Sequence, residues 1–237
     1  MKKIVFFALL AALCTALPCA ADDAPLRTVV YHYAIEGHGF GSSPGMGSVG
    51  GASSTVFENS YSGSSSRTGT ITVNVISATG DGGLVVDVKQ EIDRQFKPLQ
   101  TVRCALYGAT TDVVCDQHLW ISPETNALLV YFGRQFFEPT RLDDKGHWHV
   151  SPERINSGFK VDNDFTVLKA DGKIVTIGVD REERAGGFRS TTTGSVVYDA
   201  GLDVPDSVDL QSEMAGSRSQ GDVQIRLDLV SDSMAKR

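Results

Sequence analysis

Three things are scarce in this sequence: long apolar runs, positive charge and cysteine. Its one long apolar run, Ile4–Leu17, falls short of the ~20 residues that a membrane-spanning helix requires, so we expect no integral membrane helix. Lysine and arginine number 22 against 29 aspartate and glutamate residues, giving a net charge of −7. A negatively charged protein has no electrostatic attraction for nucleic acid or an anionic membrane surface, and both are excluded as partners.

The apolar run belongs to a pattern that is typical of a cleaved secretory signal. Lys2 and Lys3 precede it, and the small residues Ala20-Ala21 stand before the acidic pair Asp22-Asp23. We therefore expect residues 1–21 to be a signal peptide and residues 22–237 to be the mature protein, in the periplasm or outside the cell. Loss of the two lysines takes the net charge from −7 to −9.

Cysteine numbers four, and cleavage of the signal would remove two of them, Cys14 and Cys19. The remaining pair, Cys104 and Cys115, is placed symmetrically about Gly108–Thr111, a sequence suited to a hairpin turn. In an oxidising compartment this placement predicts a disulfide between opposite, non-hydrogen-bonded positions of one hairpin. The wide spacing differs from the Cys-x-x-Cys of thiol oxidoreductases, so we interpret the pair as structural.

Apolar and polar residues alternate along most of the mature chain, which indicates half-buried β-strands. The turn sequences Gly80–Gly83 and Ala170–Lys173 separate neighbouring runs, and such short connections favour antiparallel pairing. The clearest alternating runs are Thr28–Ile35, Thr70–Ile76, Leu84–Ile92, Val208–Met214 and Val223–Leu229.

One segment has helical features instead. Ser122-Pro123-Glu124 provides an N-cap, a proline at the first turn and an acid near the positive end of the helix dipole. Leu128, Phe132 and Phe136 follow at spacings of four, predicting a helix of about ten residues with a wide apolar face. The predicted fold is mainly β: one curved antiparallel meander sheet, half-barrel-like, with this helix on its concave face. A two-sheet β-sandwich is the alternative.

We expect residues 22–237 to form a single domain interrupted by a flexible Gly/Ser-rich loop at 37–66. The mixed-sign run Asp180–Arg184 is interpreted as a solvated strand end. This outline resembles the architecture of half-barrel periplasmic lipoprotein carriers. No motif accompanies the resemblance, and we assign no family from it.

Three classes of function remain. The first is a non-enzymatic envelope protein, a structural or interaction module whose loops or edges contact another envelope protein. The second is a carrier of an apolar, lipid-like ligand, bound in a cleft that Leu128, Leu129, Phe132 and Phe136 would line. The third, a metal-dependent enzyme, depends on His147 and His149, which share one face of a strand and lack an evident third ligand. No cofactor is predicted. Whether side chains fill the space between helix and sheet separates the first two classes.

Overall fold

A computed structural model describes residues 24–41, 61–80, 82–94, 101–107, 113–116, 121–151, 160–185, 188–216 and 219–235. The predicted signal peptide, residues 1–21, lies outside these ranges. Within them the chain forms eleven strands, one α-helix and one short 3₁₀ helix. Their bounds are β1 Arg27–Gly41, β2 Tyr61–Ala78, β3 Leu84–Ile92, β4 Val102–Leu106, β5 Val113–Cys115, α1 Pro123–Val130, η1 Pro139–Arg141, β6 His147–Val150, β7 Lys160–Asp171, β8 Ile174–Ala185, β9 Phe188–Asp199, β10 Val204–Gly216 and β11 Ser219–Asp232.

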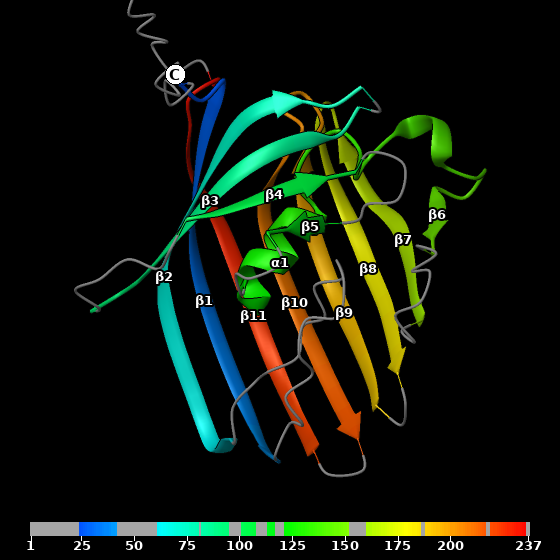
Figure 1. Cartoon of the computed structure of the whole chain (residues 1–237). Coiled ribbons are helices and arrows are strands. Elements are labelled where there is room, and N and C mark those ends of the chain that lie inside the picture. The colour runs from blue at the N-terminus through cyan, green and yellow to red at the C-terminus, as the bar shows by residue number, and fades with distance from the viewer. Residues whose placement is uncertain are drawn as a thin grey trace, which may run out of the picture.

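All eleven strands belong to one antiparallel sheet with the order β5-β4-β3-β2-β1-β11-β10-β9-β8-β7-β6. Neighbours in the sheet are neighbours in sequence except at β1 and β11, which pair at the centre. The chain runs outward from β1 to β5, crosses the hollow through α1 to β6 at the far edge, and returns to β11 (Figure 1). The prediction of a single curved, mainly β sheet is confirmed, and the two-sheet alternative is wrong.

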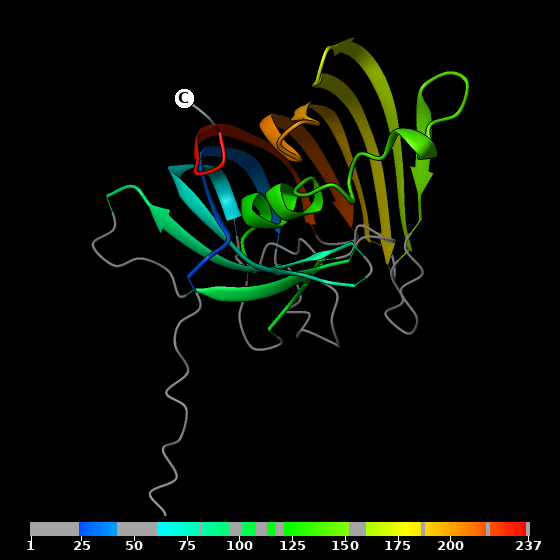
Figure 2. The ribbon, with the colours of Figure 1, turned by 90° about the horizontal axis from the view of Figure 1, so that it is seen from above.

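The sheet bends strongly around α1, which lies in its hollow (Figure 2). Register shifts interrupt four strand pairings, and shifts of this kind increase local bend and twist. Gly69 lies opposite Tyr33 in the β1–β2 pairing, and a Cβ there would stand 2.0 Å from the Glu91 carbonyl oxygen and 2.8 Å from the tyrosine ring. The tyrosine ring therefore covers the backbone of β2 at a position where no other side chain fits.

α1 is shorter than the sequence predicted. It begins as expected, with the Ser122 hydroxyl accepting a hydrogen bond of 3.2 Å from the Thr125 amide, and it ends at Val130. Gly133 adopts a φ of 93°, and its amide donates to the Asp203 carbonyl at 3.0 Å. This long-range contact diverts the chain, so Phe132 and Phe136 lie beyond the helix. No helix in the described ranges is both long and apolar enough to cross a bilayer.

The Gly/Ser-rich stretch 37–66 contains more strand than the sequence predicted. β1 continues through Gly41 and β2 starts at Tyr61, so both ends of the stretch pair with each other in the sheet. Residues 42–60 lie outside the described ranges. The sequence missed these strand ends because glycine and serine have low β propensity, whereas β11 supplies a second neighbour for β1 down to Gly41.

Candidate functional site

The candidate site is the hollow between α1 with its following segment and the concave face of the sheet. Four residues predicted to line a ligand cleft, Leu128, Leu129, Phe132 and Phe136, are 0%, 1%, 0% and 0% exposed. All four side chains are thus buried, whereas ligand binding by them stays a prediction. The facing sheet residues Tyr31, Ile71, Ile177 and Leu227 are also 0% exposed.

These exposed fractions indicate whether a void lies between α1 and the sheet. A void large enough for one water molecule would leave exposed area on every side chain that lines it. Zero exposure on both the helix side and the sheet side therefore means that side chains fill the space beneath α1 at these positions. A ligand at this place would require α1 and the segment after it to move.

Aromatic rings occupy the part of the hollow next to β6 and β7. Phe136 lies at the centre, in edge-on contact with Tyr131, Phe165 and Tyr198 at centroid distances of 5.0, 5.3 and 5.4 Å. Trp148 stacks on Phe165 at 4.9 Å. Burial raises the pKa of the Tyr131 phenol to about 12, and burial also raises that of Tyr198. Both phenols are neutral at physiological pH and cannot act there as bases.

A buried ion pair fixes the start of α1 to the sheet. Glu124, in the first turn, is 0% exposed, and its carboxylate accepts hydrogen bonds from Arg67 at 3.1 and 2.8 Å. Gln90 on β3 donates a third bond to it at 2.6 Å. A carboxylate at a helix N-terminus is also stabilised by the helix dipole. With its charge matched by an arginine in two-point contact, Glu124 serves to position α1.

A second buried ion pair was not foreseen. Arg181 and Glu183, in the run interpreted as a solvated strand end, form an ion pair with side chains only 11% and 6% exposed. They continue the inward-facing series of Val175, Ile177 and Val179, so the alternation of β8 contained the signal. The charges of this run led to the prediction of a solvated strand end. That prediction is wrong for Arg181 and Glu183.

The lining of the hollow changes from apolar to polar along the strands. One row of cross-strand neighbours joins Phe165, Val179, Gly194, Leu210, Ile225 and Ile35. The adjacent row joins Asn163, Arg181, Thr192, Ser212, Val223 and Gly37, and the Thr192 and Ser212 hydroxyls are 2.7 Å apart. The first row is apolar, with a gap at Gly194, whereas the second contains charged and polar side chains.

The histidine pair lies elsewhere, on the outer face of β6. His147 and His149 are both exposed, and His149 Nδ1 stands 2.9 Å from an Asp164 carboxylate oxygen. Its Nε2 is 4.0 Å from Asp162, whose pKa is lowered chiefly by a hydrogen bond from Ser151. Among the described residues, no group of three or more histidine, cysteine or acidic side chains could hold a metal ion. Metal binding by the two histidines stays a prediction.

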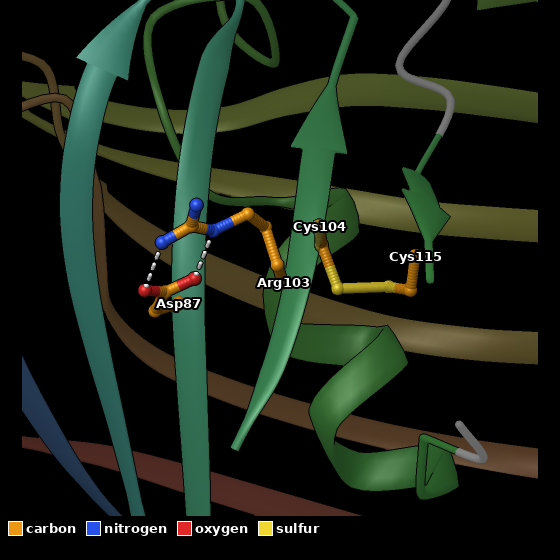
Figure 3. Close-up of a disulfide and its surroundings, with 4 residues drawn as sticks. All are labelled: Asp87, Arg103, Cys104 and Cys115. Atoms are coloured by element: carbon orange, nitrogen blue, oxygen red, sulfur yellow. Dashed lines mark hydrogen bonds and ion pairs between the residues drawn. A yellow bond between two sulfur atoms is a disulfide. The ribbon is translucent and has the colours of Figure 1, made fainter. Parts of the chain in front are cut away.

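The predicted disulfide is present. Cys104 on β4 and Cys115 on β5 face each other with Cα atoms 3.9 Å apart (Figure 3). The Asp116 amide donates to the Arg103 carbonyl at 3.0 Å, so the neighbouring cysteines occupy a non-hydrogen-bonded pair, as predicted. On the other side of β4, Arg103 makes two bonds of 2.7 Å to Asp87 on β3.

Comparison with known proteins finds likeness to solved structures but no match among families or curated sequences. No protein-family model matches the chain, and no curated protein sequence matches it. A solved structure titled "Lipid-protein interactions in lipovitellin" superimposes with a TM-score of 0.43 and 8% identity, over 91% of this chain and 26% of that one. The chain thus spans about a quarter of the lipovitellin chain. A likeness of this size carries no conclusion about family or function.

Proposed function

We propose that this protein is an exported, non-enzymatic envelope protein that acts as a structural or interaction module. The observation that carries the proposal is the filled hollow: α1, the segment after it and the sheet meet through buried side chains, and the most enclosed of them are 0–1% exposed. A core of this kind supports a rigid sheet and leaves no room for a ligand beneath α1.

The open edges of the sheet support the proposed role as an interaction module. The sheet does not close, because β5 and β6 stand at opposite ends of the strand order. Strand edges carry unpaired backbone donors and acceptors, and extended segments of other proteins bind to such edges. The contact with another envelope protein is accordingly proposed at an edge of the sheet, with the hollow serving as the core that holds the edges in place.

A carrier of an apolar ligand is the alternative, and the apolar row on the inner face of the sheet favours it. If α1 moved away, Leu210, Ile225 and Ile35, which are neighbours on β10, β11 and β1, would present an apolar surface to a lipid chain. In that case ligand would replace the contacts that Leu128 and Phe132 make in the filled state.

Native mass spectrometry of the protein purified from the exported fraction tests the proposal. The expected spectrum contains a chain that begins near Asp22, with one disulfide and without lipid or metal, in a discrete complex with another protein. One lipid bound per chain would overturn the proposal in favour of the carrier. A stoichiometric metal would overturn it in favour of the metal-dependent enzyme. A monomer without any partner would contradict the interaction role.

A further inference from the structure

One of the two Asp-Gly sequences of the chain forms the tip of the β7–β8 hairpin. Asp171 is the last residue of β7 and pairs with Ile174, the first residue of β8, so Gly172 and Lys173 form a two-residue turn. Gly172 has a φ of 62°, and Asp171, Gly172 and Lys173 are all exposed. The other Asp-Gly sequence, at 81–82, begins outside the described ranges. The Asp171-Gly172 bond therefore lies in solvent, at a place where the chain turns.

The groups on both sides of this bond are unengaged. Among the described residues, none forms a hydrogen bond or ion pair with the Asp171 carboxylate, and none accepts a hydrogen bond from the Gly172 amide. A Cβ added at Gly172 would meet no atom within 4 Å, so the space around it is open. Because glycine has no side chain, nothing shields its nitrogen from the neighbouring carboxyl group. The carboxyl carbon of Asp171 can therefore approach this nitrogen by rotation within Asp171, at the end of its strand.

The turn between β9 and β10 supplies an internal comparison. Asp199 is the last residue of β9, and its Oδ1 accepts hydrogen bonds from the Gly201 and Leu202 amides at 2.7 and 3.1 Å. The next amide, that of Ala200, donates to the Lys173 carbonyl at 2.8 Å. Both groups that would react at Asp199 are thus held by hydrogen bonds, whereas their counterparts in the β7–β8 turn are not.

We propose that Asp171 is a site of spontaneous isomerisation, in which the main chain becomes linked through the side-chain carboxyl group. The Gly172 nitrogen attacks Cγ of Asp171, a C–N bond forms, the amide gives up its proton, and a carboxyl oxygen leaves as water. The product is a five-membered cyclic imide. Water then opens the ring at the original main-chain carbonyl carbon, so Cγ carries the peptide bond and the former carbonyl carbon becomes a free carboxylate. One water is lost and one is taken up, nothing is oxidised or reduced, and the net charge is unchanged.

The isomerised linkage lengthens the main chain by one carbon at the tip of the hairpin. A two-residue turn fixes the register of its strands, so an added atom is incompatible with the pairing of Asp171 and Ile174. The tip also contacts the next turn, where the Lys173 carbonyl accepts from Ala200 and the Lys173 side chain lies against Gly201. The modification thus loosens the rim of the sheet at these two turns and leaves the buried face of β8 in place. This inference is independent of the proposed interaction role.

Incubation of the mature, disulfide-bonded protein in water labelled with oxygen-18, at neutral pH and body temperature, tests the proposal. Ring opening places one labelled oxygen in the residue, and mass spectrometry of proteolytic peptides, with fragmentation specific for β-linked aspartate, locates it. We expect both signals at Asp171 to appear at least about tenfold faster than at Asp199, because the hydrogen bonds of Asp199 must break before it reacts. The peptide that contains Asp81 is measured separately.

Two variants separate the structural argument from the sequence alone. Ala200→Gly gives Asp199 a following glycine while the amide at 200 keeps its hydrogen bond, so labelling at Asp199 should stay at least about tenfold slower than at Asp171. Asp171→Glu requires a six-membered ring and should abolish the signal in this peptide. Equal labelling of Asp171 and of Asp199 in A200G would overturn the inference.

A synthetic peptide with the sequence of residues 166–177 is the reference for unrestrained reactivity. If the folded protein shows no label at Asp171 while the peptide is fully converted, the hairpin protects this bond and the inference is wrong. In the aged protein, hydrogen exchange should be faster at amides of 169–176 and unchanged in β1 and β11. Faster exchange throughout the sheet would contradict a change that is confined to the rim.

Discussion

Truncation of Phe132 to alanine tests whether the hollow is a filled core. The side chain is 0% exposed and belongs to the buried hydrophobic core, so its removal leaves a cavity that neighbours close only in part. A Phe→Ala change at such a position costs about 3–5 kcal/mol of the free energy of unfolding. For a domain of this size, the loss corresponds to a fall in Tm of about 6–20 °C.

Denaturant unfolding of both proteins, with the disulfide intact, measures the difference. Val230→Ala is the matched control, because Val230 is 61% exposed and its truncation should change stability by no more than about 0.5 kcal/mol. A cost below about 1 kcal/mol for Phe132→Ala, together with lipid extracted from the purified wild-type protein, would refute the filled-core argument. That result would mean that ligand occupies the space in the native protein.

Three further predictions concern export and the two best-defined ion pairs. Mass analysis of exported protein should give a chain beginning near Asp22, and an intact Met1 would contradict the signal peptide. Glu124→Ala leaves Arg67 without its buried partner and should lower the free energy of unfolding, measured by chemical denaturation, by about 2–4 kcal/mol. This figure is already reduced because the Arg67 side chain is 30% exposed. The control Glu138→Ala, which removes an exposed ion pair, should lower it by at most about 1 kcal/mol. Burial acts to raise the pKa of Asp232, but hydrogen bonds from Arg27 and the Met234 amide bring it below its usual value, so its stabilisation is present above about pH 4 and lost as pH falls further. Asp232→Asn should therefore flatten the acid limb of the stability profile, and an unchanged limb would contradict the assignment.

Local patterns in the sequence predicted much of the fold. The alternation of Val223–Leu229 predicted a strand with one buried face, because successive side chains of a strand point to opposite faces. Ser122 as the N-cap of α1 and the bonded Cys104–Cys115 pair were also predictable, since both depend on residues within a dozen positions of each other. Each of these features uses interactions that neighbours in the chain supply.

Features that depend on distant residues were not predictable. α1 ends early because Gly133 bonds to Asp203 and to the Tyr198 hydroxyl, contacts that no local pattern indicates. Arg181 was also placed wrongly by sequence reasoning. Its position in the alternation of β8 indicates an inward side chain, whereas its charge indicates exposure to solvent.

The sequence by itself determined the strand periodicity, the helix start and the disulfide, since each follows from spacing along the chain. Only the tertiary structure decided the pairing of β1 with β11 at the centre of the sheet and the filling of its hollow. β1 and β11 pair although they lie near opposite ends of the sequence, and Arg67 bonds to Glu124, which is 57 positions further along the chain. Such pairings are selected by the total burial and hydrogen bonding of the folded sheet, which no single segment encodes.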